Sequence, residues 1–448
     1  MLDLMPDTAN SLSQEMLNAC LKLPDNITQM ERDGKILFFN PDMPAWMVTN
    51  ANGAFLLSLC DGNNSVANIL DALAEVQSQD MLSTAQAFFR EAVDSGIFSR
   101  PEANECPVSQ DRQWLSSVQL SISGSCNLNC KYCYATDRKE SRFPKMTLDD
   151  YKRVVDDILE YAPGTEFSVT GGEPLLNPDV FDIAAYIHSK GVGVDLLTNA
   201  TLLNEANIQR LAKVFDKVTV SLDGSTEQKH DRFRGKGAHA RTMHALQLLE
   251  QYQVPCFLAM TVNRLNIDDV QAMAELYGDR LGFAPLFPAG NAKKGEEDIS
   301  ITGLEYFNAL KQAAGVRPLG YCEATLDAAI DRRRCKCAVG GAEISISETG
   351  DVYPCQLLHY PQFLMGNIHE SPVSELHRSS PVTEQCARMV VDNIQGCADC
   401  FLRYVCGGAC RARAFHECGD IMTSGRFCEY EKAAFIDGIF EIYSANKL

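Results

Sequence analysis

The stretch SGSCNLNCKYCYA at residues 123–135 decides the fold of this chain. The strand-like run Val118–Ser123 leads into it, and three cysteines follow in a CxxxCxxC spacing: Cys126, Cys130 and Cys133. Three thiolates in one loop can hold three corners of a cubane iron–sulfur cluster, whereas an electron-transfer cluster normally takes four. The triplet therefore indicates a cluster whose open iron binds another molecule. Zinc, which thiolates also hold, is the alternative at this point.

The triplet, with the aromatic Tyr132 before its third cysteine, resembles the signature of radical S-adenosylmethionine (SAM) enzymes. In that family the open iron chelates SAM, which is cleaved reductively to methionine and a 5′-deoxyadenosyl radical. The sequence GGEP at residues 171–174 follows the next apolar run and resembles the family's second motif. The resemblance implies that the SAM amino group is held by Gly171, Gly172 and Glu173. It also places Tyr132 beside the adenine.

Three further SAM contacts are implied by this resemblance. Ser221, in VSLDG, matches a serine that contacts the ribose, and Arg234, in HDRFRG, matches an arginine that approaches the SAM carboxylate. Arg232 is a nearby competitor for that role, and Asn199 is an additional candidate. Local capping or a surface ion pair is the alternative for each.

Strand and helix patterns alternate from residue 118 to about residue 288. Six βα-type repeats predict a parallel sheet with helices outside it. The resemblance specifies an α/β fold with a partial (β/α)₆ barrel, whose active site lies at the carboxyl ends of the strands. The predicted strands are Val118–Ser123, Phe167–Thr170, Val192–Thr198, Lys217–Leu222, Pro255–Val262 and Phe283–Phe287.

A second cysteine group follows the barrel and resembles the SPASM pattern, Cx(9–15)Gx4C, then CxxCx5CxxxC, then a last cysteine. The resemblance implies two auxiliary [4Fe–4S] clusters, and thus three clusters in all. Cluster I would use Cys337, Cys355 and Cys410, with Cys335, Cys322 or an open site as the fourth position. Cluster II would use Cys397, Cys400, Cys406 and Cys428.

Other cysteines complicate this pattern. Cys418 lies between two of the proposed ligands and could replace one of them, while Cys386 and four more fit no pattern. Zinc is the alternative for both auxiliary sites. The segment ISETGDVYPC, which ends at Cys355, predicts a hairpin with its turn at residues 349–351.

Residues 25–98 predict a small winged-helix module. Strand-like runs flank the turn Asp33-Gly34, and helices are expected after Asn50 or Asn52 and after Ser65. The sequence LLSLCDGNNSVANIL resembles the PqqD-like recognition element of peptide maturases, which takes a leader peptide as an added strand. We expect the exposed edge near Lys35–Phe39 or Ala45–Val48. A structural or oligomerising domain is the alternative.

Composition limits the remaining classes. The chain has 448 residues and a net charge of −19, which disfavours nonspecific nucleic-acid binding. It shows no membrane-length apolar run and no secretory signal pattern. Its 18 cysteines, clustered at metal-type spacings, favour a reducing cytoplasm. The remaining expected boundaries are a linker at 99–116, the barrel at 117–315 and the SPASM extension at 316–448.

The order of these parts resembles radical SAM enzymes that crosslink ribosomal peptides. The resemblance implies a precursor peptide bound by its leader, an electron donor such as flavodoxin or ferredoxin, and formation of a thioether or carbon–carbon bond. A related enzyme acting on a folded protein, as sulfatase maturases do, or on a tetrapyrrole is an alternative within the superfamily. A non-catalytic metal-binding scaffold is the alternative outside it.

Overall fold

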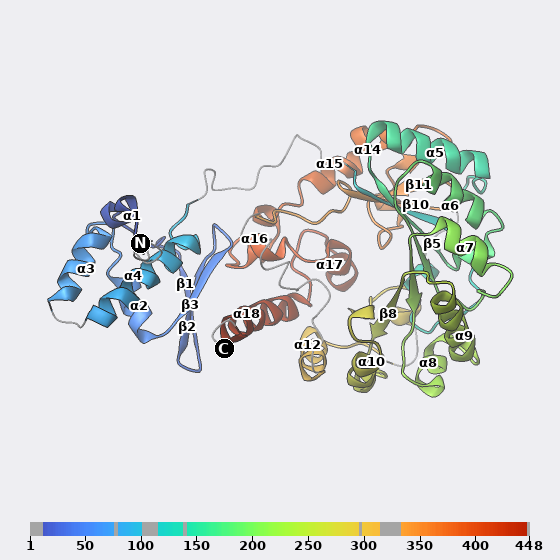
Figure 1. The fold of residues 1–448 in the computed structure, drawn as a ribbon. Coiled ribbons are helices and arrows are strands. Elements are labelled where there is room, and N and C mark those ends of the chain that lie inside the picture. Colours follow the sequence, from blue (N-terminus) through green and yellow to red (C-terminus); the bar gives the residue numbers. More distant parts are fainter. Residues whose placement is uncertain are drawn as a thin grey trace, which may run out of the picture.

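The computed structural model describes residues 12–75, 79–100, 115–137, 141–294, 298–313 and 333–445. Figure 1 shows a small N-terminal module and a large α/β body, with C-terminal helices lying between them. These helices are α16 (Arg403–Cys406), α17 (Arg411–Cys418) and α18 (Cys428–Ala445). Most of the expected linker at 99–116, and Cys322, lie outside the described residues.

Six parallel strands form the barrel sheet, and they are neighbours in space in the same order as in the sequence. All six predicted strands are confirmed to within a few residues, and so is the open barrel of parallel strands. They are β4 (Ser117–Ser123), β5 (Glu166–Gly171), β6 (Val194–Thr198), β7 (Lys217–Ser221), β8 (Cys256–Val262) and β9 (Leu281–Pro285).

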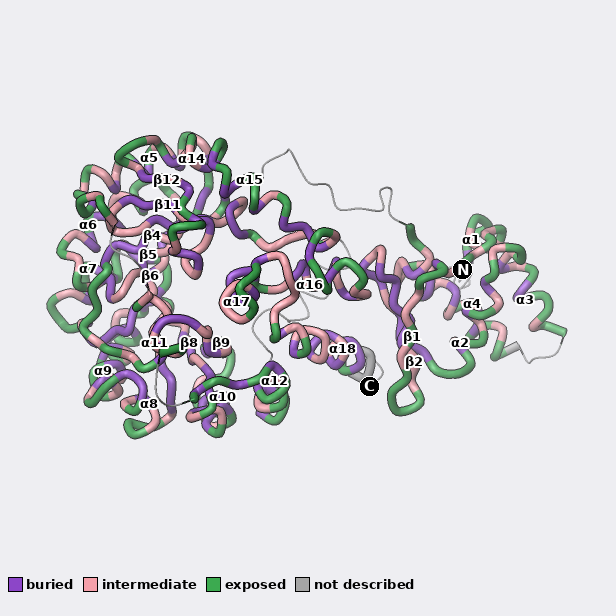
Figure 2. Tube along the Cα trace, turned by 180° about the vertical axis from the view of Figure 1, so that it is seen from behind, coloured by how far each residue is buried: buried purple, intermediate pink, exposed green. Residues whose placement is uncertain are grey.

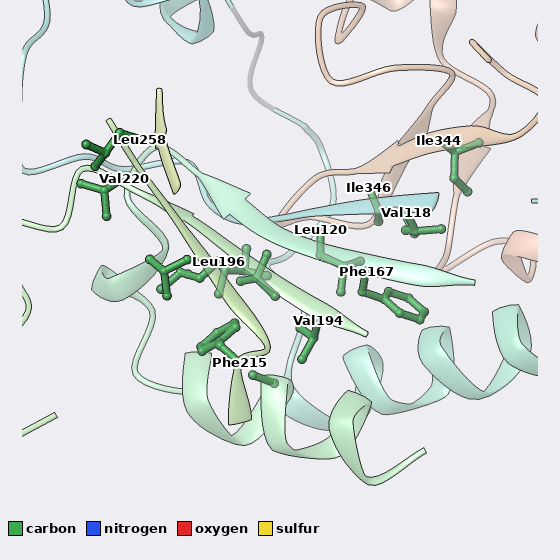
Figure 3. Close-up of a cluster of buried hydrophobic side chains, with 14 of the residues drawn as sticks. Val118, Leu120, Phe167, Val194, Leu196, Phe215, Val220, Leu258, Ile344 and Ile346 are labelled. Atoms are coloured by element: carbon green, nitrogen blue, oxygen red, sulfur yellow. The ribbon is translucent and has the colours of Figure 1, made fainter. Parts of the chain in front are cut away.

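Helices connect these strands and cover the outer face of the sheet (Figure 1). Branched and aromatic side chains such as Val118, Phe167 and Val220 are fully buried in the core (Figure 3). Thr147 begins α5 with a capping box in which it and Asp150 each accept the other's backbone N–H. The helices are α5 (Leu148–Tyr161), α6 (Val180–Ser189), α7 (Ile208–Val214), α8 (Glu227–Arg234), α9 (Ala238–Gln251), α10 (Val270–Tyr277), α11 (Asn291–Lys294) and α12 (Gly303–Gln312).

The predicted cysteine-region hairpin forms, and it also extends the barrel sheet. Strand β10 (Glu343–Ile346) pairs parallel to β4, and β11 (Asp351–Tyr353) and β12 (Gly366–Asn367) continue the sheet in antiparallel register. Gly350 turns the hairpin with φ +79°, a conformation that glycine adopts without strain. The extension is therefore built onto the barrel edge. Helices α14 (Val373–Ser379) and α15 (Pro381–Ala387) follow it.

The N-terminal module contains a three-stranded antiparallel sheet in the order β1-β2-β3. Asn50 and Ser65 cap their helices as expected. Of the two segments expected at an exposed edge, Lys35–Phe39 lies in the central strand and pairs on both sides, whereas Ala45–Val48 lies in an outer strand that pairs on one side among the described residues. The elements are α1 (Gln14–Asn18), β1 (Thr28–Arg32), β2 (Lys35–Asn40), β3 (Ala45–Thr49), α2 (Ala51–Ser58), α3 (Val66–Ala74) and α4 (Gln79–Asp94).

Both faces of the module's sheet are apolar, because successive residues of a strand point to opposite faces. Phe38 and Met47 pack with residues of α2 and α4 in the module's own core. Leu37, Phe39 and Val48 pack instead with residues of α16 and α18. Figure 2 shows this sheet lying beside α16 and α18. The module therefore docks on the C-terminal helices through a sheet face.

Candidate functional site

The carboxyl ends of the barrel strands open into a cavity of about 620 Å³. Its walls come from the cysteine loop after β4, from the ends of β5–β9, and from C-terminal residues between 356 and 431. Active sites of barrels built from parallel strands lie at this end. Predicted residues of both the barrel and the cysteine-rich extension line this cavity, so it is the candidate functional site.

All three cysteines of the CxxxCxxC loop line the cavity. Burial raises the pKa of Cys130 to about 11; Arg234 opposes this, while Cys133 and Cys126 add to it, so the three thiols are neighbours. Asn291 holds the loop: its side chain donates to the Cys130 carbonyl at 2.9 Å and its backbone to the Cys133 carbonyl at 3.0 Å. Three thiols facing a cavity fit an iron–sulfur cluster with one open iron.

Two glycines of the GGEP motif also line the cavity. Gly171 has φ +147°, and a Cβ there would lie 2.4 Å from the Ser123 carbonyl oxygen. A Cβ at Gly172 would lie 2.4 Å from the Ser125 carbonyl oxygen. Glycine therefore lets the end of β5 approach the start of the cysteine loop closely, which brings the two motifs together.

Glu173 is fully buried and is not among the residues that line the cavity. Its carboxylate accepts hydrogen bonds from Thr198 Oγ1 at 2.7 Å and from the Asn199 backbone N–H at 2.9 Å. Burial raises its pKa. Glu173 thus ties the end of β5 to the end of β6, and it positions Asn199, whose side chain donates to Cys126 Sγ at 3.8 Å.

Asp223 is a buried carboxylate that organises two of the predicted SAM contacts. It accepts hydrogen bonds from the Tyr132 hydroxyl and from Arg234 Nε, and Arg234 Nη2 donates to the Tyr132 hydroxyl at 2.6 Å. The Thr261 backbone N–H donates to its other oxygen at 2.8 Å. Asp223 had no role in the sequence prediction, although its place in VSLDG at a strand end is a usable signal.

Most of the other residues predicted to contact SAM line the cavity, and their competitor does not. Arg234, Ser221, Asn199 and Tyr132 all line the cavity. Arg232 is exposed on the same helix and does not line it. Burial raises the pKa of Tyr132 well above its usual value, so its hydroxyl stays a neutral donor. The geometry therefore favours Arg234 over Arg232 as the cavity cation.

The first auxiliary group is brought together as predicted. Burial raises the pKa of Cys355, and the charges of Glu343, Cys410 and Cys337 act in the same direction. Cys410 also lines the central cavity, and its sulfur accepts the Arg413 backbone N–H at 3.4 Å. The three thiols fit three corners of a cluster, of which the Cys410 corner lies at the cavity wall.

The fourth position of this group stays a prediction. Cys335 is disulfide-bonded, and Cys322 lies outside the described residues. Cys386 is buried, with a pKa raised to about 12 by burial and by nearby Cys337. Sequence reasoning set Cys386 aside because it lies in no cysteine motif. Its proximity to Cys337 arises from the tertiary fold, and no spacing in the sequence indicates it.

The second auxiliary group surrounds a small cavity of about 20 Å³, which is lined by Cys397, Cys400, Cys406 and Cys428. Burial raises the pKa of Cys406 to about 11, and Cys397 and Cys428 add to it. Cys418 lies exposed at the end of α17 and does not line this cavity. No three His, Cys, Asp or Glu side chains within the described ranges are arranged to hold a single metal ion.

Three charged side chains line the central cavity among the described residues. Arg234 is paired with Asp223, and Arg413 with Glu417 at 3.3 Å and with the carbonyls of Leu286 and Pro285. Glu431 has no ion-pair partner in the described part of the chain, and burial raises its pKa to about 7. The cavity therefore has paired cations and one unpaired carboxyl.

Comparison with known families assigns both parts. Residues 120–277 match the radical SAM superfamily, and residues 337–401 match the SPASM iron–sulfur cluster-binding domain. The chain is a radical SAM enzyme with a SPASM domain. The AdoMet-dependent heme synthase of Methanosarcina barkeri is 28% identical over 70% of this chain and 96% of its own length. Mycofactocin maturase MftC of Mycobacterium ulcerans is 27% identical over 66% and 82%.

A solved structure extends the likeness in fold to more of the chain. Streptococcus suis SuiB, bound to precursor peptide SuiA, matches 91% of this chain and 99% of its own with a TM-score of 0.58 at 13% identity. This radical SAM enzyme thus shares its fold with SuiB over a longer stretch than its sequence alignment with the heme synthase covers. No helix in the described residues is long and apolar enough to cross a membrane.

Proposed function

We propose that this enzyme uses the 5′-deoxyadenosyl radical to install a thioether or carbon–carbon crosslink in a ribosomal precursor peptide. One observation carries the proposal: the N-terminal sheet ends in strand β3, which pairs with β2 alone among the described residues. A strand edge of this kind can take an extended peptide through main-chain hydrogen bonds. The SuiB likeness supports this, since that enzyme was solved with its precursor peptide.

Different residues of the barrel would hold the cluster and SAM. Cys126, Cys130 and Cys133 would hold the cluster, and the backbone at Gly171 and Gly172 leaves room beside it. When bound, SAM and this cluster supply a primary carbon radical that can abstract hydrogen from an unactivated C–H bond.

The cavity walls orient and shield the reactants. Asp223 fixes the direction of Arg234 and Tyr132 toward the cavity, where we propose that they contact the SAM carboxylate and adenine. Ser221 would contact the ribose. Aromatic side chains of the cavity wall limit access to the reacting centre, which suppresses side reactions of a radical intermediate. They are Phe287, Phe427 and Tyr430.

The two SPASM cysteine groups would hold two further clusters, for three in total. Cys410 lies at the cavity wall with Cys337 and Cys355 near it, and we propose that their cluster accepts an electron from the substrate. Cys397, Cys400, Cys406 and Cys428 form a closed set of four, which suits electron transfer. We propose flavodoxin or ferredoxin as the external donor and the cytoplasm as the compartment.

The charge of the cavity favours a peptide over a tetrapyrrole. A porphyrin carries several carboxylates, which need basic partners; Arg413 is paired with Glu417, and Arg234 is the residue that we propose for the SAM carboxylate. Glu431 adds an unpaired carboxyl whose pKa burial raises to about 7, and its charged form would repel such a substrate. A neutral or basic peptide segment meets neither obstacle.

A tetrapyrrole remains the second candidate because of one observation. The heme synthase of Methanosarcina barkeri aligns over 96% of its length with this chain. That alignment leaves the rest of this chain unmatched, and a small-molecule substrate needs no strand edge to recognise it. The N-terminal module thus separates the two candidates.

The deciding experiment compares a precursor peptide encoded beside the gene with the same peptide lacking its leader. Under anaerobic reducing conditions, mass spectrometry should show loss of two hydrogens in the full precursor and little change in the leaderless core. Equal processing of both would contradict leader recognition by the module. Turnover of an iron porphyrin, with neither peptide modified, would establish the second candidate instead.

A further inference from the structure

The N-terminal module covers the second auxiliary cysteine group through an apolar contact. On the module's side, Leu37, Phe39 and Val48 are buried in this contact, and Trp46 packs against it. On the other side lie residues of the loop between Cys397 and Cys406 and of helix α18. These are Leu402, Val405, Phe435, Ile439 and Phe440, with Cys400 and Phe401 partly buried beside them.

Aromatic contacts define the geometry of this cover. Phe39 meets Phe401 edge-on at 5.5 Å between ring centroids, and Trp46 meets Phe435 edge-on at 6.0 Å. Phe401 is the residue directly after Cys400, and Phe435 lines the small cavity that the four cysteines surround. Phe435 therefore separates Trp46 from the cysteine cavity.

Ion pairs hold the edges of the same contact. Asp42, in the turn between β2 and β3, accepts from Arg403 at 3.0 Å, and Arg403 also lines the cysteine cavity. Arg32 of β1 pairs with Asp437 of α18 and lies over the Phe440 ring at 4.8 Å. Three residues that line the cysteine cavity are thus in contact with the module: Leu402, Arg403 and Phe435.

We infer that the N-terminal module has a second task besides peptide recognition: it is the cover that keeps water away from auxiliary cluster II. This rests on the proposed assignment of Cys397, Cys400, Cys406 and Cys428 to that cluster. Solvent exposure is one of the levers that set the reduction potential of an iron–sulfur cluster. Water stabilises the more negatively charged reduced form, so opening the cover raises the potential.

The test uses the full chain with all clusters loaded and needs no substrate. Trp46→Ala opens the aromatic cover, and Asp42→Asn removes the charge that holds Arg403 without altering any apolar contact. Phe55→Ala is the matched control, because Phe55 is an aromatic of the same module that is 56% exposed. Circular dichroism and limited proteolysis check that the module remains folded in each variant.

The expected result is a selective effect on one cluster. In Trp46→Ala, about a third of the iron–sulfur absorbance should bleach several-fold faster in air, and one midpoint potential in an EPR-monitored titration should rise. Asp42→Asn should shift both in the same direction by less, and Phe55→Ala should match the wild type. Unchanged bleaching and potentials in a folded Trp46→Ala variant would overturn the inference.

A double variant separates this inference from the cluster assignment. Cys397→Ala/Cys400→Ala should remove cluster II, and adding Trp46→Ala to it should change neither bleaching nor the remaining potentials. If the cysteine variant keeps all its iron, the assignment of cluster II is wrong. If the cysteine variant loses iron but Trp46→Ala still alters the remaining clusters, the cover does not act on cluster II.

Discussion

The loop of Cys126–Cys133 and the loop of Cys397–Cys406 use the same ligand chemistry in opposite surroundings. The first opens into a cavity of about 620 Å³ and offers three thiols. The second, with Cys428, offers four thiols around about 20 Å³ and has an aromatic cover on one side, while Cys428 also lines the large cavity. Thiolates alone do not determine what a cluster does; an open wall lets a cluster bind a ligand, and a closed one confines it to electron transfer.

We expect the largest effect on activity from removing the cysteine ligands of the open loop. Cys126→Ala, Cys130→Ala and Cys133→Ala together should abolish formation of 5′-deoxyadenosine with dithionite, because the cluster whose open iron binds SAM is lost. Most auxiliary iron should stay, since its ligands lie on other segments. The measurements are product chromatography and iron analysis. SAM cleavage by the triple variant would show that the cluster lies elsewhere.

The matching change in the closed loop should act on turnover more than on SAM cleavage. Cys397→Ala/Cys400→Ala should lose about a third of roughly twelve irons per chain, by the ligand count of three cubanes. Crosslinked product should then fall further than 5′-deoxyadenosine, as the radical forms but the electron has no path out. Zinc bound in the native protein, with a single iron–sulfur cluster, would contradict the two-auxiliary-cluster assignment.

A smaller effect is expected from the residue that orients the open site without holding the cluster. Asp223→Asn keeps the size of the side chain but removes the charge that pairs with Arg234. SAM should bind about ten to a hundredfold more weakly, in line with the loss of one buried charged partner. Equilibrium dialysis with labelled SAM measures this. Ser225→Ala, a change outside the cavity lining, is the control, and equal affinity in both variants would contradict the role of Asp223.

Sequence reasoning succeeded where the signal is local. The six strands and the caps at Asn50 and Ser65 each depend on neighbours within a few residues. It failed where the partner is distant. Nothing near residue 343 indicates that β10 pairs with β4, although Gln119 and Glu343 are in contact across 224 residues of sequence.

The same limit applies to partners that sequence reasoning did not foresee. The contact of Glu173 with SAM stays a prediction, and its carboxylate also binds donors at the end of β6, because a buried carboxylate takes the donors nearest to it. The edge expected at Lys35–Phe39 became a central strand, since strand order depends on tertiary pairing and not on apolar content. The docking of Trp46 on Phe435 likewise joins distant segments and leaves no pattern.

The smallest expected effect is a difference between the two regions in how their stability depends on pH. His230 lies beneath the open site, where its Nδ1 accepts the Asp223 backbone N–H at 3.1 Å and its buried Nε2 has no partner in the structure. Burial lowers its pKa to about 4, and the charge of Arg234 lowers it further. The unfolded chain takes up a proton at His230 near pH 6.5, and the folded barrel does so only near pH 4. Stability is therefore full above pH 6.5 and falls as the pH drops toward 4.

Between pH 7.5 and 5.5 this linkage should cost about 1 kcal/mol of unfolding free energy. Anaerobic denaturant titrations at the two pH values, followed by barrel-region hydrogen exchange, measure the loss. His230→Asn keeps a side-chain acceptor for the Asp223 N–H but cannot be protonated in this range, so its barrel should lose about 1 kcal/mol less. The described side-chain contacts of His230 are with Asp223 and His239 of the barrel, so local exchange of the α16–α18 region around the closed loop should respond equally to acid in both proteins. An identical pH dependence of the barrel in the variant and the wild type would remove His230 as the source of the difference.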